Sequence, residues 1–559
     1  MIRKSPLCWA LGLNIFFLFL YLMFGQVSHG SLDDYFMSSV LTGAYGSEYD
    51  VHLYFINAAY GYLLKPLYLL FPKVGWYFLT ELAGTFAAFT SVSYFIIQKL
   101  GQRFGGTLTF FLLAALTPDF YFQLSFTQCA TVYTAASFLL LYFGGVEKKK
   151  IWLGLGVLFF VAGSIMRHEA LLMGLPFLCL LLSLQFLNLK KPCWPTLFAL
   201  CVAIFAVWGL RTYDRSLYTE GDYRYYAEYQ PIRAYFGDGA FYDDESTYDE
   251  LEERQMNGLD YKLAKSWFFY DTRVLCPDSL GAMREISQRN LFIHNYKRFP
   301  IAFFMAISRA MTRTNGWCWV VFCLLLMVTP SWKSNIYPWV SLSIIALLFG
   351  YLLWINRLAY HVETGVWIYA VVSAIPLLTK ESFTSTTLLR QRKKMWPVAV
   401  VVLSLVLVSL NISCQRLLKQ HLTLIDTPEM PQEWHQFVAY AKERPNDAFL
   451  LSYDRYKELG VVKNPAYKAI APGSWQNIFS WGYWNINLPG MKKELAKRGV
   501  QNPLRDIVND NVYVLQDSYP SSLTLYYFNH YHKELQVDTV KAFGDLHLLK
   551  YSVKEANHE

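Results

Sequence analysis

Two adjacent carboxylates, Asp33 and Asp34, are the side chains of this chain best placed to do chemistry. They lie in segment 30–36, a few residues past the first apolar run. Acidic groups beside apolar surroundings are costly to hold, so they usually persist where a base, a metal site or a counter-charge is needed. One carboxylate can take a proton from a hydroxyl, while its neighbour orients the acceptor or a divalent cation. The pair therefore indicates general-base chemistry or metal binding at a membrane surface.

Basic side chains at the ends of predicted apolar segments could act as partners of this acid pair. A lipid-linked donor would bring a phosphate or pyrophosphate to the membrane surface, and the planar fork of arginine suits that group best. The arginines concerned are Arg167, Arg211, Arg309 and Arg357, and His168 and Glu169 follow the first of them. Each also has an ordinary structural explanation; for Arg211 it is interfacial snorkelling.

The composition indicates a membrane protein. The 559 residues are 54% hydrophobic and only 16% charged, whereas soluble domains carry about 25% charged residues. The net charge of +8 does not indicate nucleic-acid binding, because lysines and arginines cluster in short gaps between apolar runs. The nine cysteines include no CxxC pattern, so the sequence predicts neither a disulfide framework nor a zinc site.

The apolar runs predict about eleven membrane spans, since a spanning helix needs about 20 mainly apolar residues. The first run lacks a small-residue cleavage site, so we expect a retained helix and not a signal peptide. The predicted spans are 8–25, 76–98, 106–122, 124–143, 151–166, 170–187, 195–210, 316–330, 336–354, 364–378 and 396–412.

The basic clusters predict the orientation of these spans. With a cytoplasmic N-terminus, nearly every compact cluster of lysine and arginine falls on the same side, as the positive-inside rule requires. The outer side then receives a first loop, 26–75, a second loop, 211–297, and the tail. We therefore expect a transmembrane module over 1–412 and an extracytoplasmic domain over 413–559.

The first outer loop contains two predicted helices. A short one covers 34–41. The second, within 51–71, is apolar and rich in tyrosine but contains Gly61, Lys65 and Pro66, which favours a helix in the membrane interface over a span.

The tail alternates helix and strand signals, which predicts a small α/β domain. Thr427 and the next two residues could cap the first of its helices. An aromatic cluster, 475–484, is more often a surface that packs a domain onto its neighbour than a sugar-stacking site. The predicted helices are 434–444 and 491–498, and the predicted strands are 448–452, 511–515, 523–528 and 546–553.

The plan as a whole resembles the GT-C superfamily of integral-membrane glycosyltransferases, such as the protein O-mannosyltransferases and the lipid A aminoarabinose transferases. The likeness lies in a basic N-terminus, one span, an early acidic pair, about a dozen spans and an outer C-terminal domain. Its sequence-specific part is the stretches 33–38, 52–57 and 71–72. The acidic dipeptide of the family maps onto Asp33 and Asp34. His52 and Asn57 are further site candidates. The soluble tail departs from the better-known members.

The resemblance implies transfer of a sugar from a polyprenyl-phosphate donor to an acceptor hydroxyl outside the cytoplasm. Asp33 or Asp34 would be the general base, and an outer arginine would hold the donor phosphate. Some relatives need a divalent cation, Mg²⁺ or Mn²⁺, which the two aspartates would bind. The implied partners are membrane lipids and a glycan, lipid or protein acceptor, and the implied location is a bacterial plasma membrane.

Two other classes of function are compatible with the sequence. A transporter or lipid flippase would explain the spans. Such proteins usually place ionisable groups at mid-membrane, but the predicted spans contain few charged residues there, and Glu81 is the main exception. An assembly or sensor protein would use Asp33 and Asp34 merely to cap the helix that starts near Tyr35.

Overall fold

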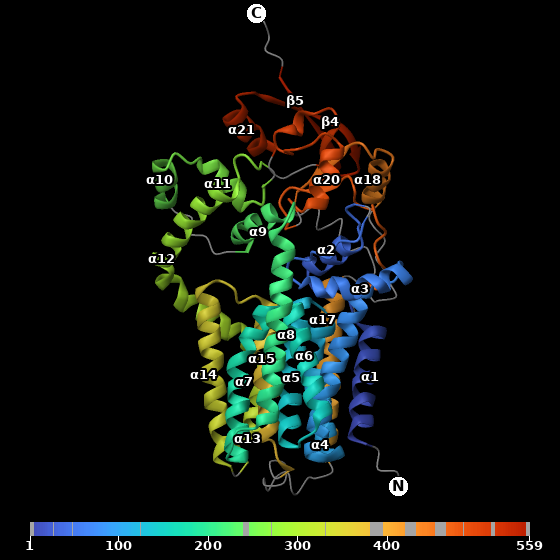
Figure 1. Ribbon diagram of the computed structural model, residues 1–559, viewed down its shortest axis with the longest axis vertical. Helices are drawn as coiled ribbons and strands as arrows, with labels where there is room; N and C mark the ends of the chain where they lie inside the picture. Colours follow the sequence, from blue (N-terminus) through green and yellow to red (C-terminus); the bar gives the residue numbers. More distant parts are fainter. Residues whose placement is uncertain are drawn as a thin grey trace, which may run out of the picture.

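The chain folds into a bundle of long helices with a smaller unit of helices and strands stacked on one end (Figure 1). The structure is a computed structural model in which 71% of the residues are helical. We call the end of the bundle that lies under α2, α3, α9 to α11 and the C-terminal unit the capped end. The structure describes residues 5–25, 27–46, 48–122, 124–238, 245–269, 271–329, 331–380, 395–419, 432–452, 455, 466–484, 486–515 and 520–554.

Up to residue 419, the described residues are mainly helical. Their helices are α1 Pro6–Phe24, α2 Leu32–Leu41, α3 Ala58–Leu70, α4 Trp76–Tyr121, α5 Phe126–Val146, α6 Lys150–Met166, α7 His168–Leu189, α8 Trp194–Thr219, α9 Tyr223–Asp238, α10 Glu245–Glu253, α11 Gly258–Lys265, α12 Pro277–Met311, α13 Thr314–Met327, α14 Trp332–Trp354, α15 Tyr360–Ala374, the 3₁₀ turn η1 Ile375–Leu377 and α17 Met395–Lys419.

Six described helices are long and apolar enough to cross a membrane: α1, α4, α5, α7, α8 and α14. A bent pair, 295–310 with 314–327, meets at 76° and would be a seventh if it forms one span. Helix α5 is the centre of the bundle, since 94% of its apolar window is buried. These helices are typical of a membrane protein, and the count of eleven spans stays a prediction.

Helix α4 consists of two arms that fold back on each other. Gly101, with φ +81°, interrupts the helical backbone. A Cβ on Gly105 would lie 2.7 Å from Cα of Ile97, although residues eight apart in a straight helix are about 12 Å apart. The rings of Phe89 and Phe120 also meet, at 5.3 Å. The two arms correspond to the predicted spans 76–98 and 106–122.

The C-terminal unit is a five-stranded sheet with helices, as the sequence predicts. The strand order is β2-β1-β3-β5-β4; β1 pairs in parallel with β2 and β3, and β5 is antiparallel to β3 and β4. Its elements are α18 Gln432–Lys442, β1 Ala448–Leu451, β2 Ile478–Ser480, α20 Pro489–Lys497, the 3₁₀ turn η3 Asp506–Val508, β3 Val512–Leu515, α21 Pro520–Tyr531, β4 Leu535–Phe543 and β5 Leu546–Val553.

One predicted strand of the tail is wrong. Segment 523–528 reads as a strand because threonine and aromatic residues favour strands, but it lies within helix α21. A helix places residues four apart on one face, and the rings of Tyr527 and Tyr531 indeed meet at 4.7 Å. Tertiary contacts therefore override the local propensity. Strands β2 and β4 were not predicted from the sequence, and the predicted cap at Thr427 lies outside the described residues.

Both predicted helices of the first loop are present, as α2 and α3. Helix α3 exposes a row of apolar side chains at its C-terminal half; Leu63, Leu69 and Leu70 are 65–70% exposed. A helix with such a face gains free energy when it lies against lipid. Its position in a membrane interface stays a prediction.

A buried carboxylate of the second loop, Asp271, binds three side chains of the C-terminal unit. Its Oδ2 accepts hydrogen bonds from the hydroxyls of Tyr526 (2.8 Å) and Tyr531 (2.5 Å), and its Oδ1 accepts one from Asn502 Nδ2 (2.8 Å). Burial acts to raise the pKa of Asp271, but these hydrogen bonds outweigh it and hold the pKa below its ordinary value. The carboxylate form thus ties the two parts together.

We expect Asp271→Ala to loosen this attachment by about 3 kcal/mol, because it leaves buried tyrosine and asparagine donors without an acceptor. Since the pKa is lowered in the folded state, the contribution is complete above about pH 4 and disappears as the pH falls further. The measurement is limited proteolysis and thermal unfolding of detergent-solubilised protein. Asp538→Ala, at an exposed aspartate of β4, is the control. Equal protease resistance of both variants would contradict the role of Asp271.

Candidate functional site

The acid pair lies in the first turn of α2, and neither aspartate caps that helix. The N-cap is Ser31, whose side chain accepts a hydrogen bond from the backbone N–H of Asp34 (3.2 Å). The explanation of the pair as a helix cap is therefore wrong. Successive residues of a helix point in different directions, and here Asp34 is fully buried whereas Asp33 is partly exposed.

The carboxylate of Asp34 anchors α2 to the bundle. It accepts hydrogen bonds from Ser31 Oγ (2.5 Å), Tyr77 Oη (2.8 Å) and the backbone N–H of Phe126 (3.0 Å). The last two donors come from the starts of α4 and α5. Burial raises the pKa of Asp34 to about 7, although the three hydrogen bonds oppose that shift. A carboxyl with such a pKa can hold or release a proton near neutral pH.

Glu81 is a member of this cluster that sequence reasoning did not include. It lies one turn after Tyr77 on α4, is fully buried and interacts with Asp34. Neither of its side-chain oxygens has a hydrogen-bond partner among the described residues. The sequence signal was present, since Glu81 is an acid in a predicted span, but its closeness to Asp34 depends on how α2 packs on α4.

Asp33 faces the C-terminal unit. Its Oδ1 accepts a hydrogen bond from the hydroxyl of Tyr483. Next to this contact, the ring of Tyr483 stacks on that of Trp267 at 6.2 Å, and Trp484 meets Phe55 at 5.7 Å. The cluster 475–484 is thus buried between the two parts of the protein, which confirms its predicted packing role. The aromatic rings of this cluster also lie next to Asp33.

Arg167 is the predicted arginine that shares a neighbour, Phe126, with Asp34. It caps the junction of α6 and α7, where its Nη1 donates to Thr127 Oγ1 (2.9 Å) and its guanidinium lies 5.0 Å from the centre of the Phe126 ring. Phe126 is also the residue whose N–H binds Asp34. The side chain of Arg167 is one-quarter exposed. Phe126 therefore contacts both the partly exposed guanidinium of Arg167 and the buried carboxylate of Asp34.

The other predicted candidates near Arg167 have mixed positions. Glu169 is 72% exposed and lies 3.9 Å from Arg167. Nδ1 of His168 is 3.1 Å from Ser164 Oγ, and Arg211 interacts electrostatically with this histidine. The structure therefore brings Arg167, His168, Glu169 and Arg211 to the same end of the bundle, at the α6–α7 junction and on α8.

Asn57 and Arg357 do not join the acid pair, and neither does His52, which is described below. Asn57 is a helix cap, since its Oδ1 accepts from the N–H of Ala59 (3.0 Å) at the start of α3 and its Nδ2 donates to Leu210 O (3.0 Å). Arg357 lies in the turn after α14, which Figure 1 shows at the edge of the bundle away from α2. There its N–H donates to Leu352 O (2.7 Å).

A second arginine group lies at the capped end, and it contains Arg309, one of the arginines predicted to face outward. Arg309 and Arg313, on either side of the bend between α12 and α13, both bind Oε2 of the buried Glu363, at 3.0 Å and 3.3 Å. The carboxylate of Asp119 also interacts electrostatically with Arg313, so two carboxylates face the two guanidinium groups. The sequence could not reveal that these arginines share Glu363, because Glu363 is about 50 residues away on α15.

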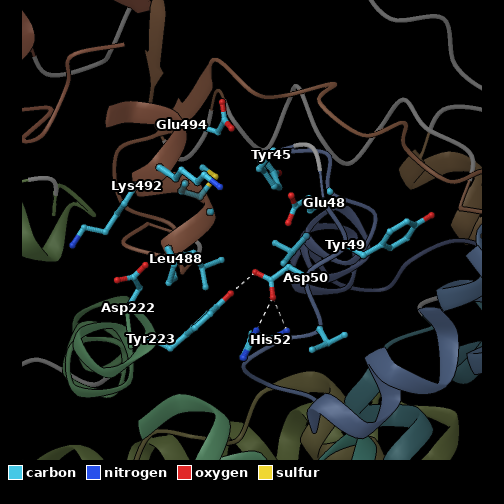
Figure 2. A pocket seen from close by; sticks show the side chains of 18 of the residues that line it. Tyr45, Glu48, Tyr49, Asp50, His52, Asp222, Tyr223, Leu488, Lys492 and Glu494 are labelled. Carbon is cyan, nitrogen blue, oxygen red and sulfur yellow. Dashed lines mark hydrogen bonds and ion pairs between the residues drawn. The ribbon is translucent and has the colours of Figure 1, made fainter. Parts of the chain in front are cut away.

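His52 belongs to a different cluster. Its Nδ1 lies 2.7 Å from Asp50 Oδ1, and Tyr223 donates to Asp50 Oδ2 (2.6 Å) while its ring stacks on the imidazole at 3.7 Å. These three side chains line a cavity of about 830 Å³ between the first loop, the start of α9 and α20 (Figure 2). His52 is therefore the predicted candidate that lines this cavity, apart from the acid pair.

No group of three or more histidine, cysteine or acidic side chains that could hold a metal ion occurs among the described residues. Asp33 and Asp34 point apart in the first turn of α2, so they do not form a shared metal site here. The chain matches no family model, no curated protein and no solved structure.

Proposed function

We propose that the protein is a GT-C-type glycosyltransferase that moves a sugar from a polyprenyl-phosphate donor to an acceptor hydroxyl at the capped end. The observation that carries the proposal is the arrangement at the start of α2. A partly exposed carboxylate and a buried one lie where the helical bundle meets the C-terminal unit, and Phe126, which binds the buried one, also contacts a partly exposed arginine. A lipid-linked phosphate and a water-soluble acceptor can meet at such a boundary.

Asp33 is the general base in this proposal, and Asp34 is a positioning residue. A base must come within hydrogen-bond reach of the proton that it removes. Asp33 meets this condition because it is partly exposed, whereas Asp34 is fully buried and holds three donors. Asp34 fixes the first turn of α2 on α4 and α5 and so aims Asp33 at the acceptor.

Arg167 holds the donor phosphate. Its guanidinium is fixed on one side by Thr127 and Phe126 and is partly exposed on the other. A fixed planar fork suits a phosphate oxygen pair, and it neutralises the charge that the leaving phosphate acquires. Any divalent cation that assists would arrive with the donor phosphate as its main ligand.

We expect Arg167→Lys to raise the KM for the lipid-linked donor and to lower kcat/KM by about tenfold to a hundredfold, because a lysine cannot keep both the fork and the ring contact. The assay is transfer from radiolabelled polyprenyl-phosphate hexoses in membranes that contain the full chain. Arg224→Lys changes a 75% exposed arginine of α9 and is the matched control. If both variants have the parent's KM for the donor, Arg167 does not bind the phosphate.

The same membranes test the function as a whole. Transfer of label to an acceptor by the parent protein supports the proposal. Movement of a labelled lipid-linked sugar across proteoliposomes without transfer would instead favour a transporter or flippase.

A further inference from the structure

The cavity of about 830 Å³ lies within the range of about 300–1,000 Å³ that is usual for ligand sites. Three separate parts of the chain form it: the first loop with α3, the turn that begins α9, and the first turns of α20. Figure 2 shows side chains from all three parts around one space. It lies among the segments that cover the bundle, not among the apolar helices.

The walls of this cavity carry groups of both charges. The acidic side chains of the wall are Glu48, Asp50, Asp222 and Glu494, and its lysines are Lys65, Lys492, Lys493 and Lys497. The structure gives Lys65 and Glu48 no ion pair within its described part. Such walls do not suit a lipid chain, because charged groups would lose water without gaining partners. They also do not suit a purely anionic ligand, since the acids would repel it.

Hydroxyl groups fit these walls best, because each hydroxyl is both a donor and an acceptor. Asp50 is held in place by the N–H and Nδ1 of His52 and by the hydroxyl of Tyr223, and it is still only half-buried. The buried hydroxyl of Tyr225, in the same wall, has no partner among the described residues. Lys492 lies 4.5 Å from the ring centre of that tyrosine. Fixed carboxylates, tyrosine hydroxyls and amines are the groups that would bind a polyhydroxylated ligand.

We propose that this cavity binds a hydrophilic glycan, which is the acceptor of the proposed sugar transfer. This assignment rests on the proposed function for its link to transfer. The two sites are connected by α2: Asp33 lies in its first turn, and Val40 near its end lines the cavity. Six to seven residues of helix span about 10 Å. A glycan of a few sugar units held in the cavity would therefore present its end to Asp33.

The test is a steric block with a matched control. Gly490 lines the cavity, whereas Gly281 on α12 does not. A Cβ added at either glycine would have no atom within 4 Å, so both positions have room for a larger side chain. We expect Gly490→Trp to weaken binding of full-length, detergent-solubilised protein to oligosaccharides on a glycan array by at least about tenfold, since it fills the space. Gly281→Trp should bind as the parent does. Tyr223→Phe, which keeps the ring, should weaken binding to a smaller extent.

The outcomes separate this inference from the proposed function. Binding does not need Asp33, so Asp33→Asn should bind the same oligosaccharides as the parent. If it binds them and also transfers sugar normally, the proposed base is wrong but the cavity assignment stands. The cavity assignment is overturned if the parent binds no oligosaccharide, or if Gly490→Trp binds oligosaccharides as well as Gly281→Trp does. It is also overturned if the parent binds peptides on a peptide array and Gly490→Trp loses that binding but keeps the binding of oligosaccharides.

Discussion

Replacing Asp33 with Asn is expected to lower the rate of sugar transfer by about 10²- to 10⁴-fold, which is the usual contribution of a general base. The amide keeps an oxygen that can accept the hydrogen bond from Tyr483, so the change removes the base with little effect on packing. The helix also keeps its cap, because Ser31 supplies it. The loss should appear in kcat, with the KM for the donor nearly unchanged.

The measurement uses membranes with matched amounts of the parent, Asp33→Asn and Asp538→Asn, the last being an exposed aspartate of β4. Thermal unfolding of the three proteins checks that they fold alike. Transfer by Asp33→Asn at the parent's rate would remove Asp33 from the mechanism. In that event Asp34 would have to reach the acceptor through an opening of the first turn of α2.

Replacing Asp34 with Asn is expected to change how stability depends on pH. Burial raises the pKa of Asp34 from 3.8 to about 7, so the folded state holds a proton that the unfolded state has lost between those values. The free energy of unfolding contributed by this group therefore falls as the pH rises from about 4 to 7. The shift corresponds to a decline on the order of 4 kcal/mol. In Asp34→Asn this decline disappears.

The amide side chain of the Asp34→Asn variant can still accept from Tyr77 and from the N–H of Phe126, so the variant should fold. The measurement is denaturant unfolding in detergent at several pH values from about 4 to 8, which bracket the pKa shift, with the parent and Asp34→Asn compared at each. Parallel curves for the two proteins would contradict the raised pKa. The same variant should lose less transfer activity than Asp33→Asn, because the role of Asp34 is to position α2.

The sequence by itself determined the general organisation of the chain, because that depends on local composition. Long apolar runs predict helices wherever they occur, and the structure has helices at the predicted spans. Alternating signals in the tail predicted a small sheet with helices, and strands β1, β3 and β5 lie at predicted positions. Asp33 and Asp34 could be recognised because an acidic pair after an apolar run is unusual at the level of the sequence.

The membership of the site was decided by tertiary structure. Glu81, Phe126 and Tyr483 are distant from Asp33 and Asp34 along the chain, and no spacing connects them; they meet because α2 packs on α4, α5 and the C-terminal unit. The same holds for the error at 523–528, where the docking of Tyr526 on Asp271 outweighs the strand propensity of the segment. Local sequence sets the hydrophobic pattern of each element, whereas burial and long-range hydrogen bonds exist only after the elements pack. For this reason the acid pair could be found from the sequence, but the different roles of its two members could not.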